Sequence, residues 1–309
     1  MKLAFLYAGQ GAQHVGMGRD LYEIYPAFRQ VLNSAPVDFD LKKLCFDGPE
    51  DQLNDTRYTQ PCMVAFAAGV TALLREAGIT PDYAAGLSLG EYSALQCAGV
   101  FDAKTAISLV AFRGQAMADA VQGRPCGMAA VLGMDRDALK AVCAEASDAG
   151  VVECTNFNCP GQIVISGDAA AVDKAGELAK AAGAKRVLPL KVSGPFHTSL
   201  MAPAGDALRE KFQSVDFGAM EIPVLFNCLG DLKGKADTIP NLLEQQVQSS
   251  VYLEDTIRRL GELGVDTVVE IGPGRTLSGF VKKTVKGIKC YPVETAEELQ
   301  AAIAALRGE

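Results

Sequence analysis

The chain has 309 residues, of which 49% are hydrophobic, 21% charged and 7% aromatic, and it contains no tryptophan. This composition is typical of a globular protein with a substantial buried core, and no stretch predicts a membrane span. A formal net charge of −8 opposes non-specific contact with anionic nucleic acids. Neither a nucleic acid nor a membrane is therefore expected as a partner.

Nine cysteines are spread along the chain without any CxxC pair, and the shortest spacing joins Cys154 and Cys159. This pattern predicts neither a disulfide framework nor a metal site, and reduced thiols fit a cytoplasmic protein. The first residues, MKLAFLYAGQ, hold an apolar run too short for a signal peptide. They predict a buried strand over 2–8 instead.

Helices alternate with short apolar strands along most of the chain. Residues 59–78 predict a helix, with Thr59 as N-cap, Pro61 in the first turn and Gly78 beyond the end. The further expected elements are helices over 91–100, 102–121 and after the Gly-Pro-Gly turn at 272–274, and strands over 82–86, 222–227 and 266–272. This alternation predicts an α/β fold with a mostly parallel sheet.

Residues 124–193 follow a rhythm of their own. The expected order is strand, helix, strand, strand, helix, strand, over 127–133, 135–147, 151–157, 162–167, 169–183 and 185–193. This βαββαβ order is the ferredoxin-like pattern. We therefore predict a main α/β domain over 1–123 and 194–309, with an inserted ferredoxin-like subdomain over 124–193.

The stretch Gly86-Leu87-Ser88-Leu89-Gly90 places one serine between two glycines, after a short apolar strand and before an alanine-rich helix. GxSxG in that setting is the nucleophile elbow, in which the helix N-terminus favours developing negative charge. In a chain with 31 glycines the motif alone is a weak signal. The alternative is a serine in an ordinary Gly-rich turn.

A serine nucleophile normally needs a base, most often a histidine, and this chain contains only two histidines. The base is therefore His14, His197 or a rarer group such as a lysine. His14 lies in a polar Gly-rich loop, where a solvated role is expected. His197 follows a predicted strand that Gly194-Pro195 ends, a position where catalytic side chains collect. If Ser88 is a nucleophile, His197 is the favoured base.

The predicted helix over 102–121 carries an arginine on its apolar side. Arg113 lies between Val110 and Met117 on that side, whereas Ser108 and Gln115 lie on the polar side. A buried guanidinium needs a partner. It can form an internal ion pair, reach solvent along its stem, or bind a substrate carboxylate with both nitrogens.

The loop AGQGAQ at 8–13 is not a phosphate-binding loop. The third glycine of GxGxxG would fall on His14, and no GK[ST] follows. The remaining functional interpretation is a loop over the elbow, of which either the backbone or the Gln10 side chain faces the nucleophile. An oxyanion hole would combine a donor from that loop with the Leu89 N–H.

Together these segments resemble the malonyl-CoA:acyl carrier protein transacylase family. The resemblance rests on GQGAQ at 9–13, GLSLGEYSAL at 86–95, FRGQAM around Arg113, NFNCPGQIVISG at 156–167, GPFHTSLM at 194–201 and EIGPGRTL at 270–277. It implies an α/β-hydrolase-like domain carrying the ferredoxin-like subdomain. It also implies a cytoplasmic transferase of fatty acid synthesis.

The resemblance implies a role for each candidate residue. Ser88 would carry the malonyl group and His197 would be its base, oriented largely by a backbone carbonyl. Arg113 would hold the malonyl carboxylate, and Gln10 and Leu89 would lie at the oxyanion hole. The implied partners are malonyl-CoA and acyl carrier protein, whose phosphopantetheine thiol receives the acyl group, and no other cofactor is expected.

Three positions bear on acyl selectivity or on the carbonyl that orients the histidine. Leu87 stands where the family usually has histidine, which leaves the width of acyl selectivity open. In the segment 246–255 the family's usual proline is missing, and Tyr252 is expected to supply the carbonyl. Phe196 before His197 resembles the malonyl-selective pattern.

Acyl carrier proteins are strongly acidic, so a local basic docking patch is expected. The candidates are Lys185, Arg186 and Lys191, and Lys282, Lys283 and Lys286. For each residue taken singly, an ordinary solvated side chain is the favoured interpretation. Three alternatives stay open: a trans-acting acyltransferase of a polyketide pathway, a serine thioesterase and a non-catalytic relative. Arg113 argues against the thioesterase, and retention of Ser88 and His197 argues against the non-catalytic relative.

Overall fold

The computed structural model describes residues 1–190 and 194–308. Within that part, a four-stranded parallel sheet and a separate four-stranded antiparallel sheet confirm the mixed α/β class. The chain forms two compact units. The first comprises Met1–Gly114, Asp216–Phe226 and Arg258–Glu309, and the second Gln115–Val215 and Asn227–Ile257.

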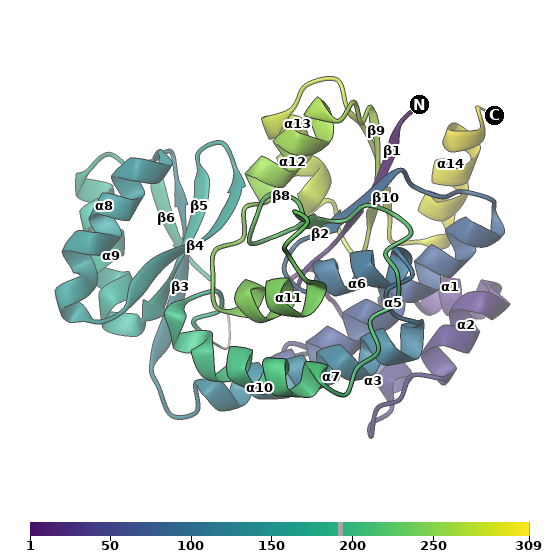
Figure 1. The fold of residues 1–309 in the computed structure, drawn as a ribbon, viewed down its shortest axis with the longest axis horizontal. Coiled ribbons are helices and arrows are strands. Elements are labelled where there is room, and N and C mark those ends of the chain that lie inside the picture. Colours follow the sequence, from purple (N-terminus) through teal and green to yellow (C-terminus); the bar gives the residue numbers. More distant parts are fainter. Residues whose placement is uncertain (191–193, 309) are drawn as a thin grey trace. The chain divides into compact units, whose positions relative to one another are not determined.

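The first unit is built on the parallel sheet, with strand order β10-β9-β1-β2 (Figure 1). Its strands are β1 (Leu3–Tyr7), β2 (Tyr83–Gly86), β9 (Thr267–Ile271) and β10 (Lys289–Val293). Phe5 pairs with Ala84 on one side and with Val269 on the other. Every residue of β1 and β9 is buried, as expected of parallel strands covered on both faces.

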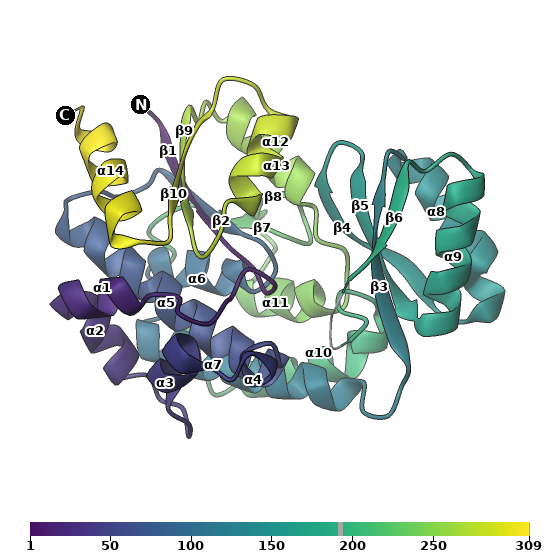
Figure 2. The same cartoon turned by 180° about the vertical axis from the view of Figure 1, so that it is seen from behind.

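Helices surround this sheet in the first unit. They are α1 (Arg19–Ile24), α2 (Pro26–Asn33), α3 (Leu41–Asp47), α4 (Glu50–Leu53), α5 (Thr56–Glu76), α6 (Gly90–Cys97), α13 (Thr276–Thr284) and α14 (Ala296–Arg307). Figure 2 shows α14 beside α1, although the two are almost 280 residues apart in sequence, and the Ala296 N–H donates to the Asp20 carboxylate at 2.6 Å. Residues of α7 (Ala103–Ala120) and α12 (Leu253–Glu262) divide between the two units.

The start of α5 differs from the prediction. The Asp55 side chain accepts from the Arg57 N–H at 3.0 Å and caps the helix, so Thr59 lies inside it and Pro61 lies beyond the first turn. The Thr59 hydroxyl donates to the Asp55 carbonyl at 3.0 Å instead of capping. The predicted end was right, because α5 stops at Glu76 just before Gly78.

The second unit contains the antiparallel sheet, with strand order β4-β5-β3-β6. Its elements follow the predicted order: β3 (Cys126–Leu132), α8 (Arg136–Ala146), β4 (Val152–Cys159), β5 (Gln162–Asp168), α9 (Ala169–Ala181) and β6 (Arg186–Pro189). Both helices lie on the same side of the sheet (Figure 1), where Leu139 and Ala175 share a core with Ile165. The predicted strand over 185–193 is β6 as far as Pro189, and residues 191–193 lie outside the described part.

The remaining short elements are η1 (Ser147–Ala149), η2 (Ser199–Met201), α10 (Ala202–Phe212), β7 (Leu225–Phe226), β8 (Asp231–Leu232) and α11 (Ile239–Val247). The strand predicted over 222–227 is reduced to β7 and one bridge between Val224 and Ala84. Pro223 has no N–H to extend the ladder. Among the described helices, none has the length and apolarity to cross a membrane.

Candidate active site

Ser88 lies at a tight turn between β2 and α6, with its backbone in the left-handed region at a φ of 51°. The flanking glycines are required by close packing. A Cβ at Gly86 would lie 2.0 Å from the Gly90 carbonyl carbon, and a Cβ at Gly90 would lie 2.2 Å from the Tyr7 oxygen. The turn is therefore the predicted strand-to-helix elbow, pressed against the end of β1.

Arg113 is buried beside this serine, with 1% of its surface exposed. One guanidinium nitrogen donates to the Gln60 amide oxygen at 2.8 Å and the other to Ser88 Oγ at 3.2 Å. The guanidinium also lies 5.3 Å from the centre of the Tyr92 ring. Burial lowers the pKa of Arg113, and the nearby Tyr92 and Glu91 oppose that shift. The predicted arginine on the apolar side of its helix thus places a cation next to the serine.

The loop after β1 lies against the same elbow. A Cβ at Gly9 would lie 2.5 Å from the Leu87 carbonyl oxygen, so the loop touches the residue before Ser88. In that loop Gln10 accepts a hydrogen bond from the Thr56 hydroxyl at 2.8 Å. Leu89 directly precedes α6, and first-turn N–H groups of a helix have no acceptor within it. Both predicted oxyanion-hole residues therefore lie at the elbow.

The motif at 270–277 holds a neighbouring loop in place. The Glu270 carboxylate accepts from the Leu277 and Ser278 N–H groups, both at 2.8 Å, and so caps the start of α13. Gly272 packs against Ala8, where a Cβ would lie only 2.4 Å from the alanine Cβ. The loops after β1 and β9 therefore meet at the carboxyl ends of their strands.

His197 belongs to the second unit, where its backbone also takes a left-handed conformation, with a φ of 63°. The residue is 3% exposed, and its ring Nδ1 lies 2.8 Å from the Gln246 carbonyl oxygen. Because a carbonyl can only accept, Nδ1 carries the proton and Nε2 carries the basic lone pair in the neutral ring. Next to it, the Thr198 hydroxyl bonds the Pro195 oxygen at 2.7 Å and fixes the turn.

The source of this carbonyl corrects the prediction. Gln246, in the last turn of α11, orients the histidine in place of Tyr252. The Tyr252 carbonyl instead accepts from Thr256 at 3.0 Å. The signal that could have identified Gln246 is its place near a helix C-terminus, where carbonyl groups have no partner within the helix.

Backbone conformation alone singles out the two predicted catalytic residues. Among the described residues other than glycine, Ser88 and His197 are the ones with positive φ. Such conformations cost free energy and concentrate at functional sites. The structure brings Ser88, Arg113, Gln10 and Leu89 together within the first unit, whereas His197 is positioned by the second.

Two polar residues near Arg113 escaped the sequence analysis. Gln60 and Thr56 on α5 are 0% and 1% exposed, and both hydrogen-bond to predicted site residues. The available signal for Gln60 was a glutamine within an otherwise apolar helical run. His14, by contrast, is half-exposed in its loop as predicted, where it bonds Glu294.

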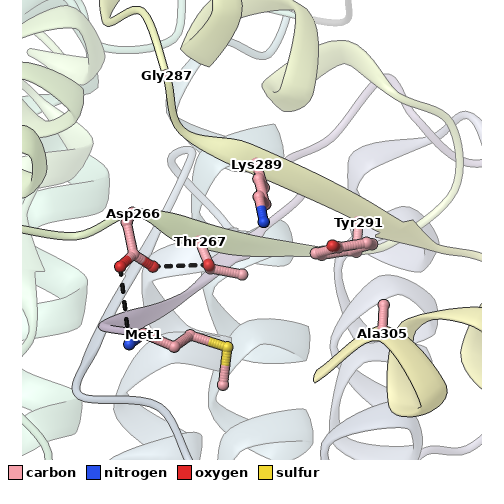
Figure 3. A pocket seen from close by; sticks show the side chains of 7 residues that line it. All are labelled: Met1, Asp266, Thr267, Gly287, Lys289, Tyr291 and Ala305. Atoms are coloured by element: carbon pink, nitrogen blue, oxygen red, sulfur yellow. Dashed lines mark hydrogen bonds and ion pairs between the residues drawn. The ribbon is translucent and has the colours of Figure 1, made fainter. Parts of the chain in front are cut away.

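A pocket of about 300 Å³ lies elsewhere on the first unit, at the amino ends of β9 and β10 (Figure 3). There the Asp266 carboxylate accepts from the Thr267 hydroxyl at 2.7 Å and pairs with the Met1 amino group at 3.8 Å. Parallel sheets bind their ligands at the carboxyl ends of the strands. The candidate site is therefore at the elbow and not in this pocket. Across the described residues, no group of histidine, cysteine and acidic side chains could hold a metal ion.

Comparison with known proteins identifies the family. Residues 4–304 match the family described as "Acyl transferase domain". The chain belongs to this acyl transferase family. A Bacillus subtilis malonyl CoA-acyl carrier protein transacylase is 43% identical, over 100% of this chain and 98% of that protein. The acyl transferase family predicted from the motifs is thus confirmed.

Solved structures of acyl transferases match the whole fold. The Clostridium perfringens malonyl CoA-acyl carrier protein transacylase superimposes with a TM-score of 0.95 at 38% identity, covering 100% of this chain and 98% of that one. A malonyl-transacylase solved in complex with its type II polyketide acyl-carrier protein gives a TM-score of 0.95 at 39% identity, with both chains covered completely.

Proposed function

We propose that this acyl transferase moves a malonyl group from malonyl-CoA to the phosphopantetheine thiol of acyl carrier protein, through a malonyl ester on Ser88. The observation that carries the proposal is the buried Arg113 guanidinium 3.2 Å from Ser88 Oγ. A malonyl group on that serine would bring its free carboxylate to a cation able to bind it with both terminal nitrogens. A thioesterase acting on neutral acyl chains has no use for such a cation.

His197 is the proposed base. Its Nε2 takes the Ser88 hydroxyl proton as Oγ bonds to the thioester carbonyl carbon, and the same proton then passes to the sulfur when the carbon–sulfur bond to CoA breaks. In the second half, His197 Nε2 takes the proton of the phosphopantetheine thiol as its sulfur bonds to the ester carbonyl carbon. The same proton then passes to Ser88 Oγ when the ester carbon–oxygen bond breaks, which frees the serine and His197 for another cycle. The Gln246 carbonyl supports this role because it holds the ring in the tautomer with a basic Nε2.

The oxyanion of each tetrahedral intermediate is assigned to the Leu89 N–H and a donor near Gln10. The helix that starts at Gly90 supports this assignment, since its N-terminal end favours negative charge. Leu87 and Phe196 are the residues we assign to acyl-chain selectivity. Leu87 precedes the nucleophile and contacts the loop that carries Gln10.

The finer fold assignment is part of this proposal. We assign 1–123 and 194–309 to an α/β-hydrolase-like domain and 124–193 to a ferredoxin-like subdomain. The strand order β4-β5-β3-β6 supports the second assignment, since two interleaved βαβ units produce that order. Nine cysteines that form no disulfide support a cytoplasmic location, and the reaction needs no cofactor beyond the thioesters of its substrates.

Intact-mass measurement after brief mixing with malonyl-CoA tests the proposal, with Ser88→Ala as control. The expected result is one malonyl group on the peptide that contains Ser88, lost on addition of carrier protein that bears its phosphopantetheine. Release of free malonate without a transferable ester would indicate a hydrolase. Faster transfer to a polyketide carrier protein than to a fatty acid carrier protein would favour the polyketide alternative, which the polyketide relative makes a real candidate.

A further inference from the structure

A chain of hydrogen bonds joins Arg113 to Gln10 through two buried residues of α5. The Arg113 guanidinium donates to Gln60 Oε1 at 2.8 Å, and Gln60 Nε2 donates to Thr56 Oγ1 at 2.8 Å. The Thr56 hydroxyl then donates to Gln10 Oε1 at 2.8 Å. The predicted carboxylate-binding and oxyanion-hole residues are therefore linked by consecutive bonds.

The direction of every bond in this chain follows from its first member. A guanidinium has donors but no acceptor, so the Gln60 amide must turn its oxygen to Arg113 and its nitrogen to Thr56. The Thr56 oxygen accepts that bond, and the single proton of its hydroxyl is donated to Gln10. Gln10 must therefore present its amide oxygen to Thr56, and its NH₂ group stays available as a donor.

The two linking residues are well placed to be rigid. Thr56 is the first residue of α5 and Gln60 follows one turn later, so both project from the same face of one helix. Both are almost completely buried. Buried hydrogen bonds between side chains are strong and restrict those side chains to one arrangement.

We propose that Thr56 and Gln60 are positioning residues of the transfer reaction. Gln60 holds Arg113 in the orientation that binds the acyl carboxylate. Thr56 holds the Gln10 side chain and, with it, the loop that supplies the second donor to the oxyanion. This inference rests on the proposed malonyl transfer. It adds that the polarity of the Gln10 amide, which the sequence leaves open, is determined by Arg113.

The two residues have separable effects that an experiment can distinguish. Thr56→Val removes the bond to Gln10 and leaves the bond between Gln60 and Arg113. It is expected to slow ester formation on Ser88 about tenfold with both malonyl-CoA and acetyl-CoA, since the oxyanion is common to both. Thr56→Ser keeps the hydroxyl and is expected to restore most of the rate.

Gln60→Glu changes the hydrogen bond to Arg113, at the other end of this series of hydrogen bonds. A carboxylate at this position pairs with Arg113 and competes with the acyl carboxylate, so the preference for malonyl over acetyl is expected to fall roughly tenfold or more. The introduced carboxylate also has no amide proton for Thr56, whose hydroxyl then turns from Gln10 to that carboxylate. Thr59→Val is the matched control. It removes a buried hydroxyl from the same helix, but that hydroxyl takes no part in the hydrogen bonds between Arg113 and Gln10.

A double-mutant cycle decides whether Thr56 acts through Gln10. In a Gln10→Ala background, Thr56→Val is expected to cause less than about a twofold further loss in the rate of ester formation. Thermal unfolding of each variant identifies any that fail to fold. For an unfolded Thr56→Val, the comparison of Thr56→Ser with Thr56→Ala replaces it.

Three outcomes would overturn the inference. They are a wild-type rate in folded Thr56→Val, a full second loss in the double mutant, and an unchanged malonyl preference in Gln60→Glu. Each presupposes that the wild-type protein forms the malonyl ester. Absence of that ester in the wild type would overturn the proposed function together with this inference. An ester in the wild type combined with any of the three outcomes would overturn this inference alone.

Discussion

The backbone at Ser88 and His197 takes a left-handed conformation that few residues other than glycine adopt. Each such residue costs on the order of 1–3 kcal/mol, so its surroundings must hold it in place. Around Ser88 the Gly90 N–H bonds the Leu87 oxygen at 2.9 Å, and His197 is held by the Gln246 carbonyl. Both side chains are thereby kept in fixed directions before any substrate arrives.

Replacement of Arg113 by alanine is expected to erase the preference for malonyl over acetyl. Loss of a charge-assisted bond to the acyl carboxylate should lower kcat/KM for malonyl-CoA by roughly 100-fold, with a much smaller effect on acetyl-CoA. Steady-state kinetics with the two thioesters measures the ratio. Arg113→Lys is the companion variant, since it keeps the charge and loses the two-nitrogen geometry. An unchanged ratio in Arg113→Ala would refute the assignment.

The pH response of His14 can be predicted from its contacts. Partial burial lowers the pKa of His14, but the hydrogen bond to Glu294 and the bond to the Val15 oxygen outweigh it, so the net pKa is raised. Both ring nitrogens face acceptors, which favours the imidazolium. Glu294 also accepts from the Gly274 N–H at 2.8 Å, so the pair ties the loop after β1 to the loop after β9.

A group whose pKa is raised on folding stabilises the protein at low pH. The contribution of His14 is therefore complete below its unfolded pKa of about 6.5 and is lost as the pH rises through the folded value. NMR titration of the two histidines measures this, with His14→Asn for assignment. Glu294→Gln should lower the pKa of His14, and an unaltered titration in that variant would contradict the pairing. The half-exposed position keeps the gain in stability below about 1 kcal/mol.

At the elbow, the backbone of α6 packs directly against the ends of β1 and β2. Helix α6 can start at Gly90, two residues after Ser88, because Gly86 and Gly90 have no side chains to separate it from β1 and β2. Regular elements here were largely predictable, since β1 and β9 are uninterrupted apolar runs between turn residues. The start of α5 was predicted wrongly, because Asp55 and Thr59 are both residue types that cap helices and the weaker of the two, Thr59, was chosen.

Gly86→Ala is expected to destabilise the protein by about 2 kcal/mol or more, because its Cβ would overlap the backbone at Gly90. Gly279→Ala in α13 is the matched control, since a Cβ there meets no atom within 4 Å. Alanine is the better helix former, so that variant should be unchanged or more stable by up to about 1 kcal/mol. Chemical denaturation gives both free energies of unfolding. Equal values for the two variants would contradict the packing argument.

The overall charge of the molecule affects how it meets an acidic partner. A net charge of −8 repels a strongly acidic carrier protein, so docking needs a local cationic surface. Lys282, Lys283 and Lys286 are exposed at the end of α13 and just beyond it, and Lys185 and Arg186 are exposed at the start of β6. The remaining candidate, Lys191, lies outside the described residues.

Reversal of the charge of one cluster tests its part in docking. Glutamate at positions 282, 283 and 286 is expected to raise the KM for carrier protein about tenfold and to weaken its dependence on salt. Formation of the malonyl ester from malonyl-CoA serves as the internal control. Glutamate at 185 and 186 forms the parallel test. Transfer at the wild-type rate in one of these variants would exclude that cluster.

Local pattern in the sequence determined the α/β class, the elbow at Ser88 and the burial of Arg113. These depend on residues a few positions apart, whose periodicity and turn chemistry can be read directly. The tertiary structure alone decided which polar groups meet. Gln10 and Thr56 are 46 residues apart in sequence, Gln60 and Arg113 are 53 apart, and His197 and the Gln246 carbonyl are 49 apart. Such pairs form only when packed elements bring distant segments together, and a backbone carbonyl leaves no mark of its own in the sequence.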